Sequence, residues 1–447
     1  MRAKLILLIL ITAGTLYSQP YPDQHIFAEK EGLIKKISSL SGMQVSSDGK
    51  SVVLSDGATS GYAIFEPDSS VSPFNRGLPS WNGYAPNTGS SFKVQIRFYY
   101  GGWSGWFTCG YWKENIWPDY GAVKDYYGNK IIDVDYVTLA SYCSKWQFQV
   151  IMSRTSAALP TPSLSKLSLF VSDQVTTDKV NITDIVNDNP APIFIDTEHF
   201  YQYALDPGIG GDICSPTSTS MAIRSYNIKV DPLQFAKDNY DNFWGMFGVW
   251  PKAVQNASQY GLNGAVTRYR TWSDARKVLA AGGRIVMSVG KPLYTGHLIM
   301  LAGFDASGIP IVHDPAIRNG YSYKFDKTAL SQSWFSKGGV SYTFFLDKNT
   351  TDVSSETGTK EISYALTNFP NPFNGQTLVR FENPQTAYTR ISVYDITGRE
   401  VGRIKDEMLN AGTWSFSWNA SGLPSGNYFI HVSSGSFQKT IKTLLLK

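Results

Sequence analysis

The sequence predicts a multidomain protein with an N-terminal all-β sandwich, a central α+β domain and a C-terminal immunoglobulin-like β-sandwich. Segments that alternate between apolar and polar residues occupy both ends of the chain, whereas the middle begins with helix signals and continues as strands. The chain has 447 residues, of which 42% are hydrophobic and 17% are charged. It therefore holds enough apolar material for several packed cores and too little charge for a disordered chain.

The first residues have the pattern of a secretory signal peptide. Arg2 and Lys4 precede an aliphatic run over residues 5–11, and small residues follow as far as Ser18. That run is too short to span a bilayer, and the basic start favours a signal over a buried N-terminal strand. No later segment approaches the roughly 18 consecutive apolar residues of a membrane helix. We therefore expect residues 1–18 to direct export to an oxidising compartment, where disulfides persist.

Residues 19–185 are predicted to form a β-sandwich of the jelly-roll-like type. Apolar and polar side chains alternate over residues 92–99 and again over residues 145–152, which is typical of strands with one buried face. The segment GGWSGWFTCGYW in this region contains three tryptophans. Such aromatic segments suggest contact with a glycan, but packing of the rings in the core and at the rim of the sandwich is the favoured interpretation.

Residues 190–347 begin as helices and continue as strands, which is an α+β plan. Pro232 and Pro251 stand at first-turn positions of two predicted helices, and Thr271 or Ser273 is the expected cap of a later one. The strands are expected in RIVMSVG, GHLIMLAGF, IPIVHD and VSYTFFL.

The remaining sequence divides into a polar segment and a second β-rich region. Residues 348–361 contain few apolar residues and are predicted to be a linker. Residues 362–447 return to short strands separated by turn residues such as those of ITGR and LPSGNY. This pattern and length suit a small immunoglobulin-like sandwich.

Cys214 follows a glycine-rich loop and opens a predicted helix. A thiol in that position meets unpaired N–H groups and the positive end of the helix dipole, and both stabilise the reactive thiolate. A nucleophilic thiol also needs a base. His297 begins one predicted strand and Asp314 ends the next, so the imidazole and the carboxylate should meet at one end of an antiparallel pair. Because neighbouring residues point to opposite faces, we expect His313 to face outward.

Three segments together resemble a known family. GGDICSPTSTSM, TGHLIMLAGFD and VHDPA are similar to the papain-like cysteine peptidases of the bacteriocin-processing (double-glycine) type, above all their stand-alone secreted relatives. The resemblance covers residues 190–347 and implies a papain-like peptidase domain that acts on a peptide or protein substrate through a thioester acyl-enzyme. It implies that Cys214 attacks the carbonyl carbon, that His297 transfers the proton, and that Asp314 fixes the imidazole tautomer.

The sequence departs from this family at two positions. The resemblance implies an oxyanion site made by the Cys214 backbone N–H and an upstream glutamine, for which Gln202 is the candidate. Gln202 lies twelve positions before the cysteine, further than in papain-like enzymes, and the glycine-rich loop would have to absorb the excess. Ser215 stands where the transporter-linked members have glycine. The sequence contains no Walker loop, so fusion to a transporter is not expected.

The C-terminal region resembles a second family. NFPNPFNGQTLVRFEN, VYDITGREV, LPSGNYFIHV and KTIKTLLLK together are similar to the C-terminal sorting domain of type IX secretion cargo. This implies transit through the periplasm, recognition by the type IX secretion machinery, and either removal of the domain or anchoring at the surface. An ordinary accessory immunoglobulin-like module is the alternative. Both interpretations predict a secreted or cell-surface protein.

Several alternatives remain open on the sequence alone. Cys214 is a structural thiol in one of them, and in another the domain is a non-catalytic, peptidase-like surface protein that binds peptide or glycan. In a third, Cys214, His297 and Asp314 catalyse acyl transfer or the hydrolysis of a non-peptide amide. Cys109 and Cys143 either form a disulfide or are both simply buried.

Other classes of function lack a signal in the sequence. No motif with credible ligand spacing predicts a metal ion or another cofactor. The net charge is only +4 and no dense block of lysine and arginine occurs, so nucleic acid is not an expected partner.

Overall fold

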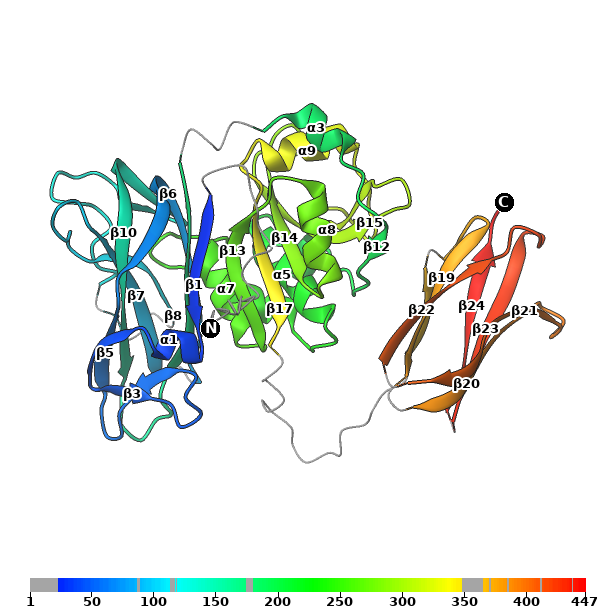
Figure 1. Ribbon diagram of the computed structural model, residues 1–447, viewed down its shortest axis with the longest axis horizontal. Coiled ribbons are helices and arrows are strands. Elements are labelled where there is room, and N and C mark those ends of the chain that lie inside the picture. The colour runs from blue at the N-terminus through cyan, green and yellow to red at the C-terminus, as the bar shows by residue number, and fades with distance from the viewer. Residues whose placement is uncertain are drawn as a thin grey trace, which may run out of the picture. The chain divides into compact units, whose positions relative to one another are not determined.

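The computed structural model describes residues 23–86, 89–112, 117, 119–173, 180–347, 365–369, 371–383, 386–410, 412–435 and 437–447. The predicted signal peptide and linker lie outside these residues. The chain divides into two compact units, with the boundary between Thr351 and Asp352 (Figure 1). Within the described ranges, none of the helices combines the length and hydropathy that crossing a membrane requires.

The first unit starts with a β-rich domain (blue to cyan in Figure 1) whose eleven strands belong to one hydrogen-bonded sheet. With the short helix α1 (Glu31–Ile34), its elements are β1 (Gln24–Glu29), β2 (Ile37–Ser41), β3 (Met43–Val45), β4 (Val52–Leu54), β5 (Ser60–Phe65), β6 (Asp68–Tyr84), β7 (Ser90–Phe98), β8 (Phe107–Trp112), β9 (Ile132–Asp133), β10 (Tyr136–Arg154) and β11 (Ser163–Ser172). The long strands β6 and β10 pair with different partners along their two halves. The strands therefore join one sheet around a single core, and the division of this sheet into the two layers of a sandwich stays a prediction.

The tryptophans of this domain contribute to packing. Trp112 is buried in the core. Trp103 and Trp106 hold the guanidinium of Arg97 between them, with its central carbon 4.6 Å from each ring centroid. These contacts agree with the packing interpretation, and contact with a glycan stays a prediction.

The second part of this unit is a layer of helices against an antiparallel sheet. Its helices are α3 (Ile182–Asn187), α4 (Gln202–Leu205), α5 (Cys214–Arg224), α6 (Pro232–Asp238), α7 (Trp250–Ser258), α8 (Trp272–Ala280) and α9 (Lys327–Phe335). Its strands are β12 (Ile193–Phe194), β13 (Leu262–Arg268), β14 (Arg284–Val289), β15 (His297–Phe304), β16 (Pro310–His313) and β17 (Val340–Leu346). They follow the order β12-β15-β14-β17-β13, and β16 pairs with β15.

The predicted helix starts agree with the structure. Proline occupies the first turn of both α6 and α7. Thr271 caps α8, because its hydroxyl accepts a hydrogen bond of 3.0 Å from the N–H of Asp274. The other candidate, Ser273, instead bonds to Asp188.

Helix α5 is buried along almost its whole length, from Ser215 to Ile223. Its small residues allow close packing on β15, and its buried hydroxyls have hydrogen-bond partners, except that of Thr217, which has none among the described residues. Ser218 donates to the carbonyl of Leu298 (2.9 Å), while Thr219 donates to the carbonyl of Ser215 (2.9 Å). Because buried hydroxyls with partners cost little free energy, this polar helix is compatible with a core position, and it holds Cys214 at one end of the sheet.

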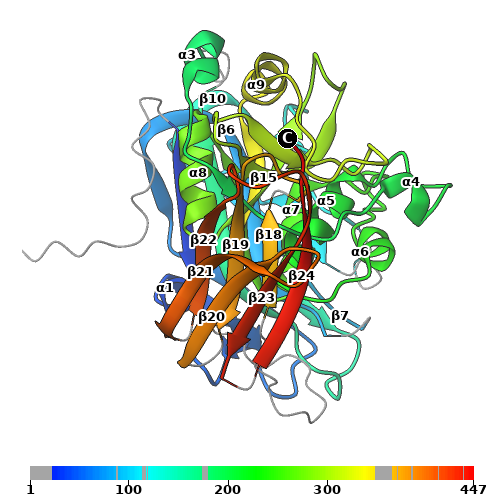
Figure 2. The same ribbon diagram turned by 90° about the vertical axis from the view of Figure 1, so that its right-hand side faces the viewer.

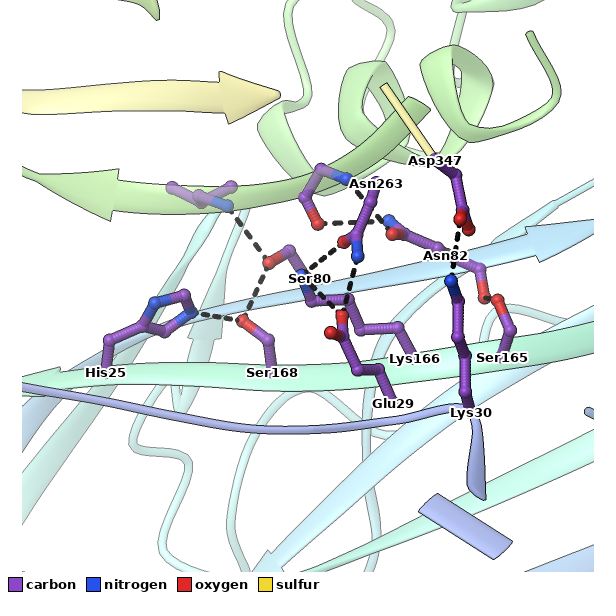
Figure 3. Close-up of polar contacts among 12 residues, drawn as sticks. His25, Glu29, Lys30, Ser80, Asn82, Ser165, Lys166, Ser168, Asn263 and Asp347 are labelled. Carbon is purple, nitrogen blue, oxygen red and sulfur yellow. Dashed lines mark hydrogen bonds and ion pairs between the residues drawn. The ribbon is translucent and has the colours of Figure 1, made fainter. Parts of the chain in front are cut away.

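Strand β13 lies between α7 and α8, where the sequence predicted no strand. It is the outermost strand of its sheet, and side chains of β6 cover its free edge (Figure 3). Asn82 donates to the carbonyl of Gly264 (3.1 Å) and accepts from its N–H (3.0 Å). Two residues earlier, Ser80 accepts from the N–H of Val266 (3.0 Å). The side chains of β6 thus replace the backbone of a neighbouring strand.

Further polar contacts extend this seam, as Figure 3 shows. Lys30 and Asp347 form an ion pair of 2.6 Å. Lys166 donates to the side-chain oxygen of Asn263 (2.6 Å), and Asn263 in turn donates to Glu29 (2.7 Å). The β-rich domain and the helical part therefore belong to one compact unit.

The second unit consists of two antiparallel sheets around one core, which agrees with the predicted sandwich (orange and red in Figure 2). Strands β18 (Ala365–Phe369), β19 (Gln376–Asn383) and β22 (Gly412–Asn419) form one sheet. The other follows the order β21-β20-β23-β24, with β20 (Ala387–Tyr394), β21 (Glu400–Leu409), β23 (Gly426–Ser434) and β24 (Phe437–Leu445).

Candidate active site

Cys214 is the first residue of α5, as the sequence predicted. The preceding residue, Ile213, contributes no side-chain cap, and Pro216 in the first turn has no N–H group. The N–H groups that remain at this helix start therefore add to the positive end of the dipole at the thiol. Cys214 is half-buried.

His297 and Asp314 meet at the same end of the sheet. His297 begins β15 and Asp314 directly follows β16, and the two strands are antiparallel neighbours. The imidazole Nε2 lies 2.8 Å from Oδ1 of Asp314, and both side chains are buried. The imidazole also hydrogen-bonds to the side chain of Cys214. The structure thus brings these three predicted residues together, and Nδ1 is the ring nitrogen left to face the thiol.

Two opposed effects determine the pKa of His297. Burial lowers it, whereas the hydrogen bonds to Asp314 and Cys214 raise it, and the net result is a pKa raised to about 9. The imidazole is therefore protonated at neutral pH and carries a positive charge beside the thiol.

Tyr294 is a site residue that the sequence analysis missed. Its hydroxyl donates to Oδ2 of Asp314 at 2.6 Å, and its ring centroid lies 4.3 Å from that of His297. Since the N–H of Ala316 and His297 both engage Oδ1, the carboxylate has one defined orientation. Burial and the carboxylate raise the pKa of Tyr294, so it remains a donor. A tyrosine three positions before a histidine forms no recognisable motif, so the sequence gives no signal for this residue.

The turn that carries Asp314 is held by the segment before α4. His199 donates from Nε2 to the carbonyl of Asp314 (2.8 Å), and the N–H of Gln202 donates to the carbonyl of Pro315 (2.9 Å). Gly320 closes this turn, because a Cβ there would stand 2.1 Å from the Asp314 carbonyl oxygen. These contacts fix the carboxylate from the main-chain side.

Gln202 is buried between this turn and the loop before Cys214. Its side-chain Nε2 donates to the carbonyl of Gly210 at 2.6 Å, while its Oε1 has no hydrogen-bond partner among the described residues. The amide thus bonds to the loop that leads into the cysteine. The second N–H group of this amide does not bond to Gly210.

His313 lies on the opposite face of β16, but it does not face outward. It is fully buried, with Nε2 donating to the carbonyl of Ile195 (3.1 Å) and Nδ1 accepting from the N–H of Ser322 (3.1 Å). Burial lowers its pKa to about 4, so the imidazole is neutral. The expectation of an outward position was wrong because Phe194 of β12 and the loop of Tyr321 and Ser322 cover this side chain.

A surface cavity of about 700 Å³ opens at the loop that contains Tyr294. It is lined by Ile182, Lys291, Pro292, Leu293, Tyr294, Thr295, Gln332 and Ser336. Tyr294 thus lines the cavity and also contacts Asp314 and His297.

The other cysteines do not form a disulfide. Cys109 and Cys143 are free and buried in the β-rich domain, and burial raises the pKa of Cys109. In the part of the chain that the structure describes, no group of three or more histidine, cysteine, aspartate or glutamate residues is placed to hold a metal ion.

Two segments match known families. Residues 194–342 match the Peptidase_C39 like family, and residues 367–447 match the secretion system C-terminal sorting domain. No curated protein matches the chain.

Solved structures give weaker similarities. PorZ, an essential surface component of the type IX secretion system of Porphyromonas gingivalis, is 17% identical over 36% of this chain and 23% of that chain, with a TM-score of 0.16. Dimeric latent PorU from the same organism is 10% identical, with 95% and 34% covered and a TM-score of 0.16. A β-glucuronidase from Faecalibacterium prausnitzii is 7% identical, with 96% and 47% covered and a TM-score of 0.13. The chain thus spans less than half the length of each.

Proposed function

We propose that this protein, in which residues 194–342 belong to the peptidase C39-like family and residues 367–447 form a secretion system C-terminal sorting domain, is a secreted cysteine peptidase. The sorting domain marks it as a protein that is secreted or lies at the cell surface. The observation that carries the proposal is the position of His297, which bonds to Cys214 on one side and to Asp314 on the other.

The proposed reaction begins with attack of the Cys214 sulfur on the carbonyl carbon of a peptide bond. Nδ1 of His297 holds the proton of the thiol and delivers it to the leaving amine as the C–N bond breaks, which leaves a thioester. Water then attacks the thioester with His297 as the base, the C–S bond breaks, the carboxylic acid product is released and the free thiol is regenerated. Asp314 stabilises the imidazolium and keeps Nδ1 toward the sulfur.

The oxyanion of the tetrahedral intermediate would lie at the N-terminus of α5. The N–H of Cys214 is one donor, and the second proton of the Gln202 amide is the candidate for the other. The loop between them leaves room for a substrate, since a Cβ added at Gly211 would meet no atom within 4 Å. Cleavage would therefore take place between α4 and the start of α5.

The proposal can be tested with a thiol-directed covalent probe applied across a range of pH. Cys214 should react rapidly at neutral pH, and Cys214→Ala should abolish labelling and peptide hydrolysis together. His297→Ala should slow labelling at neutral pH, because it removes the imidazolium beside the sulfur. His431→Ala, which removes an imidazole from the sorting domain, is the matched control.

Other results of this experiment would support the alternative functions. If Cys214 reacts like an ordinary thiol and the loss of His297 changes nothing, the domain is a non-catalytic, peptidase-like binding protein. If the thioester forms but is discharged to an added amine in preference to water, the reaction is acyl transfer. Mass spectrometry of the products separates hydrolysis from transfer.

A further inference from the structure

Lys337 lies beside the candidate site and has no role in the reaction described above. Its aliphatic chain packs against Gly290, where an added Cβ would lie 3.4 Å from the lysine Cδ. Its Nζ lies 3.8 Å from the place that a Cβ added at Gly296 would take. Gly296 directly precedes His297. The ammonium group is therefore next to the base, and its charge interacts with Cys214.

The chain holds Lys337 in this position by a constrained turn. The next two residues, Gly338 and Gly339, have φ angles of +87° and +64°. A Cβ at Gly339 would stand 1.9 Å from the carbonyl oxygen of Tyr269, so no other residue fits there. Arg268 donates from Nε to the carbonyl of Gly338 at 2.9 Å. The backbone that presents the lysine is thus fixed on both sides.

Apart from the charge of the Cys214 thiolate, little neutralises the charge of Lys337 within the site. Among the described residues, its Nζ makes no hydrogen bond and no ion pair. Asp135 of the β-rich domain is the carboxyl group that interacts with it, but its Oδ1 accepts from the N–H of Trp250 (2.5 Å). Burial raises the pKa of Asp135 to about 8, so this group is mostly uncharged at neutral pH. A half-buried ammonium whose neighbouring carboxyl group is mostly uncharged, and which makes no ion pair with a carboxylate, favours the binding of an anion.

We propose that Lys337 binds a carboxylate group of the substrate close to the scissile bond, so that the peptidase prefers acidic peptides. This inference rests on the proposed function. The carboxylate belongs either to an aspartate or glutamate side chain beside the scissile bond or to the free C-terminus of the peptide. Lysine, with a compact charge on a flexible stem, can bind both.

The first experiment compares the rates at which iodoacetate and iodoacetamide alkylate Cys214 in the full chain. Both reagents depend equally on the thiolate, but only iodoacetate carries a carboxylate. Lys337→Met should lower the iodoacetate-to-iodoacetamide rate ratio by about fivefold, which is the effect of one nearby charge in a partly hydrated site. Lys291→Met, which removes a lysine from the adjacent loop, is the control and should change the ratio less than about twofold.

The outcome separates this inference from the proposed function. Alkylation needs a reactive thiol but no peptide hydrolysis, so the ratio is informative even if no peptide is cut. An unchanged ratio in Lys337→Met overturns the inference. Equal slowing of both reagents also overturns it, because Lys337 would then act on the thiol and not on the carboxylate.

The second experiment distinguishes the two sources of the carboxylate. Matched peptides carry Glu or Gln beside the scissile bond, each with a free or an amidated C-terminus. A preference of about tenfold or more for Glu identifies the side chain, whereas a preference for the free C-terminus identifies the terminal carboxylate. Lys337→Glu should reverse the preference in favour of a peptide with Lys at the same position. Equal kcat/KM values for all four peptides contradict the inference.

Discussion

At the scale of single residues, the carboxylate of Asp314 determines the state of His297. It accepts hydrogen bonds from His297 and the N–H of Ala316 at one oxygen and from Tyr294 at the other. It is fully buried, so these donors replace water as its solvation. The imidazole next to it is therefore held as a cation in one orientation.

The raised pKa of His297 predicts the alkaline limit of the activity. Below a pH of about 9 the imidazolium supplies the proton that the leaving amine needs, and above it this proton is lost, so kcat/KM should fall with an apparent pKa of about 9. Asp314→Asn removes the anionic partner and should move this limit to lower pH. A pH profile of kcat/KM for both proteins measures the shift. An identical alkaline limit in the variant would show that Asp314 does not act on the imidazole.

Tyr294→Phe is predicted to change the same limit in the opposite direction. The variant keeps the ring against His297 but loses one donor to Asp314, so the carboxylate attracts the imidazole proton more strongly. We expect the alkaline limit to rise, and kcat to fall about tenfold at unchanged KM, because a hydrogen bond to a buried charge contributes about 1.5–3 kcal/mol. Tyr321→Phe, which loses a hydroxyl contact to Asp196, is the control and should leave the profile unchanged.

The proximity of Cys214, His297 and Asp314 could be predicted from the sequence because these residues stand at element boundaries with local signals. Cys214 opens a helix, and His297 and Asp314 stand at the ends of two strands joined by a short turn. Tyr294 and Lys337 could not be predicted in this way. Their contacts join segments that approach one another only in the folded chain, and neither residue belongs to a motif.

At the scale of elements, strand β13 was missed for a physical reason. Its sequence, LNGAVTR, contains a glycine and an asparagine that usually indicate a turn. In the structure Gly264 is required by packing, since a Cβ there would stand 2.8 Å from the ring of Phe344 and 3.1 Å from Val254. The residue that weakened the strand pattern is thus the one that lets β17 and α7 approach the strand.

The contact between Asn82 and β13 predicts a large effect of one side chain on stability. Asn82→Leu leaves the buried N–H and carbonyl of Gly264 without partners and should lower the free energy of unfolding of the first unit by about 2–4 kcal/mol. Urea denaturation followed by tryptophan fluorescence measures this change. Asn129→Ala, at an exposed turn of the same domain, should cost less than about 0.5 kcal/mol. Equal effects of the two substitutions would show that the side-chain cover of β13 adds no stability.

At the scale of the whole molecule, the sequence predicted two domains in a region that the contacts between residues define as one compact unit. Composition predicted separate domains over residues 19–185 and 190–347, and these segments do differ in secondary structure. The seam between β6 and β13 nevertheless makes them parts of one compact unit. Hydrogen bonds between side chains of one segment and the backbone of another leave no periodic signal, so they could not be predicted from the sequence.

This division predicts different outcomes for two deletions. Removal of residues 352–447 should leave the first unit folded and reactive toward a thiol probe, because the two units have separate cores. The shortened protein should, however, be retained inside the cell, since it lacks the sorting domain. Labelling of Cys214 and fractionation of the culture measure the two effects. Loss of labelling in this variant would contradict the separation of the units.

The isolated segment of residues 186–347 should fail to fold stably. It would expose the edge of β13 and would lose Asp135, whose carboxyl group accepts from the N–H of Trp250 at the start of α7. Circular dichroism and limited proteolysis of the fragment test this expectation, with the fragment of residues 19–347 as the control. A cooperative thermal transition in the shorter fragment would contradict it.

The cover of β13 by Asn82 also gives the chain an order of assembly. The two partners, Asn82 and Gly264, are 182 residues apart, and in a chain exported from its N-terminus β6 crosses the membrane before β13 does. Because the segments that emerge first fold first, β6 is in place as a template when β13 emerges. A defect that delays the β-rich domain would leave the edge of β13 open to the strands of other chains. Inherited changes far from Cys214 would then reduce the yield of the protein and leave the reactivity of each correctly folded molecule intact.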